Sequence, residues 1–276
     1  FSTKAQEEIF NKSFACKDIV LPKVLYPSWL TKEGFDFQNL LFAQGHKFIN
    51  LNGLYYPDLV RVFYYNLCKN NDRVLVSEVN CVTITMIEDV YEKVVGLEKT
   101  GIFPNFSNLK EKGVEVKKDV FFESMLRYIS AWEVDKDTKK RNSKMVTYNV
   151  GGLFIDDRLL HCCIAWVLAA RGSNHAQISE DDMILMATLK NEVEVNWIYV
   201  LEDTMLKTIR LMDYKCPYAL FISKVLAHYE VPLQSEAMEV TREAHNVKDR
   251  ALKMMKLVKH VGRWKAKMHD YSEIKA

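Results

Sequence analysis

Glycine and proline are scarce in this chain, which has 10 Gly and 6 Pro among 276 residues. Both fall below their usual shares of roughly 7% and 5%, so an all-β architecture rich in tight turns is not expected. No apolar run reaches about 18 residues and no signal peptide is visible, so we expect no membrane span. An excess of one charge is also lacking. The net charge of +2, taken over the whole chain, predicts no strongly charged partner.

The chain does have a composition typical of a folded globular protein, with 49% hydrophobic and 27% charged residues. Its length suits one large domain or two small ones. None of its six cysteines forms a C-x-x-C pair or lies near a His at zinc-finger spacing, so a zinc site is not expected. We expect reduced cysteines and an intracellular protein, with nucleus and cytoplasm both open. A start at Phe1 rather than Met is compatible with a fragment of a longer polypeptide.

Hydrophobic periodicity predicts mostly helices. Residues 57–67 form an apolar stripe behind Pro57 and Asp58, which suit a helix start. Alternating β-branched residues over 73–85 predict one small β-hairpin, and Thr85 and Glu88 resemble a capping box for the next helix. Further helices are predicted over the following ranges: 159–170, 179–189, 197–212 and 217–229.

Residues 135–144 contain no apolar side chain and predict an exposed linker. The expected fold is therefore mainly α, a multi-helix globular domain with one small β-hairpin and a long basic C-terminal helix. The expected organisation is an N-terminal helical part with the hairpin, a charged linker, a C-terminal helical part and the basic helix. Their ranges are 1–134, 135–145, 146–234 and 235–276.

The predicted C-terminal helix carries a heptad repeat and a basic face. Residues 247–269 hold eight Lys or Arg against one Asp, so the rest of the chain is acidic. Apolar residues at heptad spacing predict a self-association seam, formed by Val240, Val247, Ala251, Met254, Val258 and Val261. Basic residues on the outer surface predict non-specific nucleic-acid contact, through Lys248, Lys253, Lys256, Lys259, Arg263 and Lys267. An amphipathic helix packed on its own acidic domain, with a solvated basic face, explains the same pattern.

An acidic set raises the alternative of metal-dependent catalysis. Its members are Asp156, Asp157, Glu180, Asp181 and Asp182. Grouped carboxylates can hold Mg²⁺, but acids also favour the first turn of a helix, and Ser179 is a natural N-cap. We prefer this second interpretation. His175 lacks a partner nearby in sequence and is interpreted as a loop histidine. No phosphate-binding loop, dinucleotide fingerprint, nucleophile elbow or zinc-protease motif occurs, so no catalytic, cofactor or metal residue is assigned and no enzyme is expected.

Two regions together resemble a known family. One is Leu54-Tyr55-Tyr56-Pro57-Asp58-Leu59-Val60-Arg61-Val62-Phe63-Tyr64-Tyr65-Asn66-Leu67 with the strands that follow. The other comprises Asp157-Arg158-Leu159-Leu160-His161, then Arg171-Gly172-Ser173-Asn174-His175-Ala176-Gln177-Ile178-Ser179-Glu180-Asp181-Asp182, then Asn196-Trp197. The chain resembles the plant transposon-protein domain family abundant in legume genomes, and more distantly the first-frame proteins of Athila-type retrotransposons. The resemblance spans roughly residues 9–233. It implies a transposable-element origin and no catalytic residue, and the basic tail lies outside it.

The leading functional hypothesis is a transposable-element-derived, non-catalytic protein that acts in assembly or non-specific nucleic-acid association. The expected partners are nucleic acid and a second copy of the chain, without cofactor or membrane. Two alternatives stay open: a metal-dependent transposase or nuclease that uses the acidic set, and a helical protein-interaction domain.

Overall fold

The computed structural model describes residues 4–35, 37, 41, 46–126 and 149–266. About 47% of the described chain is helical and 14% is strand, arranged in three small sheets. The prediction of a mainly α fold with one hairpin is therefore wrong, and the fold is mixed α/β. The predicted linker 135–145 lies outside the described residues.

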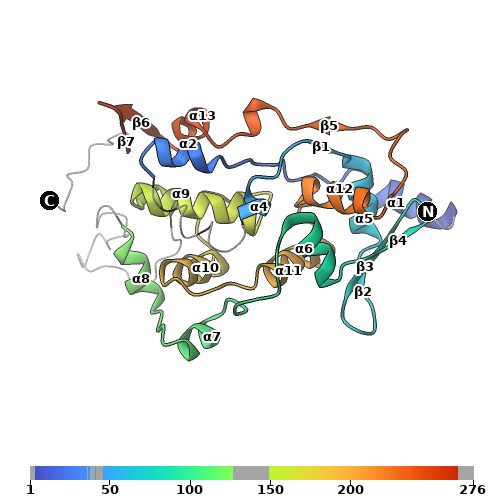
Figure 1. The fold of residues 1–276 in the computed structure, drawn as a ribbon, viewed down its shortest axis with the longest axis horizontal. Helices are drawn as coiled ribbons and strands as arrows, with labels where there is room; N and C mark the ends of the chain where they lie inside the picture. The colour runs from blue at the N-terminus through green and yellow to red at the C-terminus, as the bar shows by residue number, and fades with distance from the viewer. Residues whose placement is uncertain (1–3, 36, 38–40, 42–45, 127–148, 267–276) are drawn as a thin grey trace, which may run out of the picture.

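Helices occur throughout the described chain, and the short strands cluster over residues 54–85 and 239–266 (Figure 1). The first helices are α1 Lys4–Ser13, α2 Pro27–Lys32, α4 His46–Ile49, α5 Pro57–Tyr65, α6 Glu88–Val95, α7 Phe106–Glu111 and α8 Lys118–Ser124. The later ones are η2 Val150–Gly152, α9 Ile155–Cys163, η3 Ile164–Leu168, α10 Glu180–Lys190, α11 Trp197–Arg210, α12 Ala219–His228, η4 Glu243–His245 and α13 Asp249–Met254. The strands are β1 Leu54–Tyr55, β2 Cys68–Lys69, β3 Leu75–Val79, β4 Val82–Thr85, β5 Glu239–Val240, β6 Leu257–His260 and β7 Arg263–Ala266.

Helix α5 forms where the sequence predicts it. Pro57 occupies its first turn with Asp58 behind it, and its apolar stripe, Phe63 included, is buried. It packs against α11 and α12, and α12 also covers β1 and α6. The Tyr64 hydroxyl donates to the Pro217 carbonyl at 3.0 Å, because a buried hydroxyl needs a partner. Figure 1 shows α5 toward one end of the molecule, near α1 and the strands β3 and β4.

The hairpin predicted over 73–85 is confirmed as β3 and β4, and β2 adds a third antiparallel strand. Asn80 and Cys81 form its two-residue turn, with φ of 48° and 63°, the left-handed pairing that matches strand twist. The predicted capping box is wrong. Helix α6 begins after Ile87, which makes no side-chain cap, and it ends at Gly96, which has the left-handed φ of 67° typical of a glycine after a helix.

One large core joins most of the described chain, from Phe10 to Trp264, and a small separate cluster forms around Leu109. Near its centre, α9 runs directly into a five-residue π-helical segment, η3. Both are almost entirely buried, because their residues 159–170 are too apolar to face water. The N-terminal helices, the small sheets and the C-terminal segment thus share one interior.

The long basic helix predicted over 235–276 is wrong. Within this range the described residues form β5, η4, α13 and a second hairpin, β6–β7. Lys256 ends α13 with φ of 60°, while Val261 and Gly262 make the hairpin turn with φ of 46° and 76°. Glycine disfavours a helix interior by about 1 kcal/mol relative to alanine, and a left-handed residue pair is typical of a hairpin turn. Figure 1 shows this hairpin at one end of the molecule, beside α13 and α2.

Candidate functional site

Residues 248–266, called the basic module below, hold seven Lys or Arg against one Asp. The module comprises α13 and the β6–β7 hairpin, in which Lys259 lies opposite Trp264 and Val258 opposite Lys265. Because neighbours on a strand alternate between two faces, Leu257 and Trp264 point inward and are only 1% and 7% exposed. The outward face holds four exposed residues: Val258, His260, Arg263 and Lys265.

Glu33 connects the β6–β7 hairpin to helix α2. Its carboxylate, at the C-terminal end of α2, accepts from Lys259 Nζ at 2.6 Å and from Trp264 Nε1 at 2.7 Å. These bonds, led by the one from Lys259, hold the pKa of Glu33 below its usual value although burial opposes the shift. A second tie comes from Arg158, which donates to the Met255 carbonyl at 3.0 Å. The inward face is therefore structural, and the outward face is open.

The predicted nucleic-acid residues fall into three groups. Lys253, Lys256 and Arg263 are exposed and form no ion pair with a described residue. Lys248 is half-buried, with Nζ 4.2 Å from the centre of the Tyr26 ring. Lys259 is committed to Glu33, and Lys267 lies outside the described residues.

Two cations were missed because a helical surface was assumed. Arg250 on α13 and Lys265 on β7 are both exposed. In the predicted helix Lys265 interrupted the apolar series, whereas in the hairpin it shares the outward face with Arg263. Recognising Val261-Gly262 as a turn would have found it.

The predicted self-association residues do not form a seam. Val240 pairs with Leu54 in the β1–β5 ladder, Val247 is buried and Ala251 is half-buried. The other three are exposed and scattered over α13 and the hairpin: Met254, Val258 and Val261. Heptad spacing aligns side chains only on a continuous helix, and none spans these positions.

The acidic set is divided among separate cations. Asp157 pairs with Lys190 at 2.5 Å, Glu180 with Lys118 at 2.6 Å and Asp181 with Lys207 at 2.9 Å, and Asp182 is buried in a network of its own. Within the described ranges, no group of three potential metal-ligating side chains occurs. The predicted capping role is confirmed, because Ser179 and Asp182 form a capping box at the start of α10.

Asp182 also holds together the loop between η3 and α10. Its carboxylate accepts from Arg171 at 2.6 Å and from the Ser179 backbone N–H at 2.8 Å. His161 Nε2 lies 3.3 Å from this carboxylate and 3.3 Å from Arg171 Nη2, so the three side chains form one network. Burial alone raises the pKa of Asp182, but His161, Arg171 and the Ser179 N–H outweigh it and the pKa is lowered. His161 and Asp182 are 1% and 2% exposed, so this network stabilises the fold and no substrate reaches it.

A second group lies beside this loop at the surface. The ring of His175 stacks on Trp166 with centroids 3.7 Å apart and planes 11° apart. Lys23 Nζ lies 5.1 Å from the centre of the Trp166 ring. Burial, followed by the charges of Arg171 and His161, lowers the pKa of His175 to about 4, so its imidazole is neutral at pH 7.

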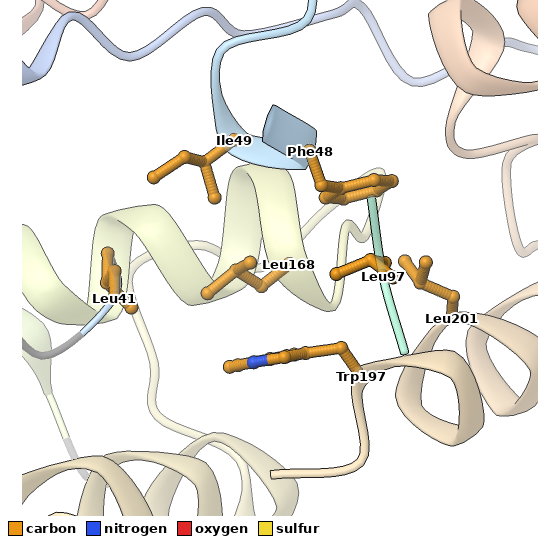
Figure 2. A pocket seen from close by; sticks show the side chains of 7 residues that line it. All are labelled: Leu41, Phe48, Ile49, Leu97, Leu168, Trp197 and Leu201. Atoms are coloured by element: carbon orange, nitrogen blue, oxygen red, sulfur yellow. The ribbon is translucent and has the colours of Figure 1, made fainter. Parts of the chain in front are cut away.

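Hollows in the described structure are small. One is a cavity of about 10 Å³ in the core. Figure 2 shows Phe48 and Ile49 on one side of it and Trp197 on the other, with Leu168 between them. Every lining side chain is mainly apolar, so it is a packing void. A second recess of about 40 Å³ has Lys23 as its one charged lining residue. Neither offers the set of polar groups that a catalytic pocket needs.

The buried cysteines are poor candidates for a reactive thiol. All six are free, and burial raises the pKa of Cys162 and of Cys216 to about 12. A thiol of this kind is protonated at pH 7 and is a poor nucleophile.

No family model matches this chain, and comparison with curated proteins and with solved structures finds no significant match. The resemblance to plant transposon proteins therefore stays a prediction. Among the described residues, no helix is both long and apolar enough to cross a membrane.

Proposed function

We propose that this chain is a non-catalytic protein that associates with nucleic-acid phosphates through the basic module. The observation that carries the proposal is the outward face of the hairpin, which together with α13 presents five exposed Lys and Arg side chains: Arg250, Lys253, Lys256, Arg263 and Lys265. None of them forms an ion pair with a described carboxylate.

The kind of binding follows from which groups are free. Cations without base-stacking partners neutralise phosphates and release counter-ions, which gives affinity without sequence preference. Trp264, the aromatic residue of this module, is buried against Glu33 and offers no face to a base. Binding should therefore be non-specific and strongly salt-dependent. A transposable-element origin fits such a role, and its support is the sequence resemblance.

The test compares two variants that each lose four positive charges. The first carries Lys253→Gln, Lys256→Gln, Arg263→Gln and Lys265→Gln. The control carries Lys99→Gln, Lys110→Gln, Lys112→Gln and Lys117→Gln, at four exposed lysines without a described ion pair. These lie on and around α7, on the opposite side of the molecule from the hairpin in Figure 1. Net charge is thus the same in both variants and only its location differs.

Fluorescence anisotropy with a labelled 20-base-pair DNA is measured from low to moderate salt. Because each phosphate contact contributes about 0.9 to the slope of log K against log salt, the first variant, which loses four cations, should lose about 3.6 from the wild-type slope. The control should keep the wild-type slope. Equal losses in both variants, or no wild-type binding at about 50 mM salt, would contradict the proposal. If the wild-type protein does not bind DNA but binds acidic peptides, the protein-interaction alternative is supported instead.

A further inference from the structure

Two cationic side chains and a histidine lie near one another where the segment around residue 24 runs beside the segment around residue 246. The Val24 N–H donates to the His245 carbonyl at 3.1 Å, and the Val247 N–H donates to the Val24 carbonyl at 2.9 Å. This parallel pairing places Lys23 next to His245. Arg250 follows five residues after His245, on α13, and acts electrostatically on Lys23.

Lys23 is held at this junction without a counter-ion. Its side chain is half-buried, its Nζ lies over the Trp166 ring, and it forms no ion pair with a described residue. His175 covers Trp166, and its buried Nδ1 has no hydrogen-bond partner in the described structure. A partly desolvated cation without a counter-ion is unfavourable, and an anion would relieve the cost.

The pKa shifts of the junction agree with its geometry. Burial, then the charge of Arg250, lowers the pKa of Lys23. The charge of Lys23 in turn helps to lower the pKa values of His175 and His245, after burial as the main cause. These residues therefore share a positive potential.

The nearby carboxylates do not cancel this potential. Asp182 acts on His175 but is bound to Arg171 and His161. Glu239 acts on His245, but the charges of Lys23 and Arg242 act on this histidine more strongly in the opposite direction.

We propose that Lys23, His245 and Arg250 form a binding site for a phosphate group. His245 Nδ1 accepts from the Arg242 backbone N–H at 2.8 Å, so the proton of the neutral imidazole is on Nε2 and can be donated to a ligand. A phosphate carries several acceptor oxygens and can take hydrogen bonds from an ammonium, a guanidinium and this N–H together. The site goes beyond the proposed function: it shares Arg250 with the basic module, but Lys23 and His245 lie outside that module and the outward face of the hairpin takes no part.

The test follows the histidine C2–H resonances by NMR as pH is varied, with His175→Asn and His245→Asn used for assignment. Inorganic phosphate is compared with chloride at equal ionic strength. Sulfate serves as a second probe, because it stays dianionic over the whole range. A nearby anion favours the charged imidazole, so phosphate should raise the pKa of His175 from about 4 toward about 5, and that of His245 in the same direction.

Lys23→Gln should abolish this effect and Arg250→Gln should weaken it, with folding checked by thermal unfolding. Lys265→Gln, on the outward face of the hairpin, should leave it unchanged. A short oligonucleotide with and without a 5′-phosphate then distinguishes a terminal phosphate from the nucleic-acid backbone as the source.

Equal titration in phosphate, sulfate and chloride, or a wild-type response in Lys23→Gln, would overturn the site. Either result would leave the DNA-binding test of the basic module standing. Conversely, if the histidines respond to phosphate but the protein does not bind DNA, the phosphate site is supported and DNA binding by the basic module is contradicted.

Discussion

Val261 is the most strained position in the C-terminal hairpin. It has a φ of 46°, a left-handed conformation that costs a β-branched residue free energy because its Cβ crowds the backbone. Its side chain is 88% exposed, so burial does not offset the cost. Gly262, the other turn residue, adopts its φ of 76° freely.

Val261→Asn should therefore stabilise the protein, because Asn-Gly is the favoured pair for this turn. We expect the free energy of unfolding to rise by about 1 kcal/mol, the low end of the cost of such backbone strain. Chemical denaturation followed by circular dichroism measures it. The control, Val258→Asn, places the same change at an exposed strand position and should be neutral or destabilising. Equal effects at both positions would show that the turn is not strained.

At the scale of elements, the β6–β7 hairpin is held by few contacts, and Glu33 makes two of them. Its side chain is 9% exposed, so water screens the pair with Lys259 only partly. The outward face of the hairpin can meet a ligand because the inward face is anchored in this way.

Glu33→Gln should loosen the hairpin and also free Lys259. Losing a charged acceptor costs about 1 kcal/mol, so the amides of β6 and β7 should exchange hydrogen faster while those of α5 and α12 do not change. If Lys259 then contacts DNA, the salt slope should steepen by about 0.9. Glu111→Gln, at an exposed acid on α7, is the control for net charge. Slower or unchanged exchange in the hairpin would contradict the anchoring role.

At the scale of the whole molecule, one core extends from the first helix to Trp264. The basic module contributes Leu252, Leu257 and Trp264 to that core. Removing residues 235–276 would expose apolar surface as well as remove charge, so surface substitutions test its function more cleanly than truncation.

Because one core joins most of the described chain, the pKa shifts of buried groups predict how the free energy of global unfolding depends on pH. The pKa of His175 is about 4 in the folded protein and about 6.5 in the unfolded chain. In the folded protein, burial and the charges of Arg171, His161 and Lys23 lower it, and the charge of Asp182 opposes them. Between these values the unfolded chain binds more protons, so the free energy of unfolding falls as pH falls from 6.5 to 4. Asp182, whose pKa is also lowered, adds a further loss below about pH 4.

His175→Asn should flatten the pH dependence between 6.5 and 4, as measured by urea denaturation at several pH values. His245, whose pKa is lowered as well, keeps part of the slope. Ser173→Ala, at an exposed neighbour in the same loop, should keep the wild-type profile. If the pH dependence of the unfolding free energy of His175→Asn overlays that of the wild type, the lowered pKa of His175 is contradicted.

Sequence by itself determined the features that depend on neighbouring residues. Pro57 and Asp58 start α5, Ser179 caps α10 with Asp182, and Gly96 ends α6. Each is a local hydrogen bond or backbone preference, and so is the β3–β4 turn. The excess of cations over residues 248–266 is likewise a property of composition alone.

Only the tertiary structure decided what the last segment becomes and which charges are free. Seven-residue spacing and lysine content predict a helix, but Leu257 and Trp264 gain more by packing on the body beside Glu33, and Val261-Gly262 permits the turn. The same contacts between residues far apart in the sequence bind Lys259 to Glu33 and leave Arg263 and Lys265 exposed. They also bring Lys23 beside His245 across more than 200 residues, because burial and long-range ion pairing depend on positions in space that periodicity cannot encode.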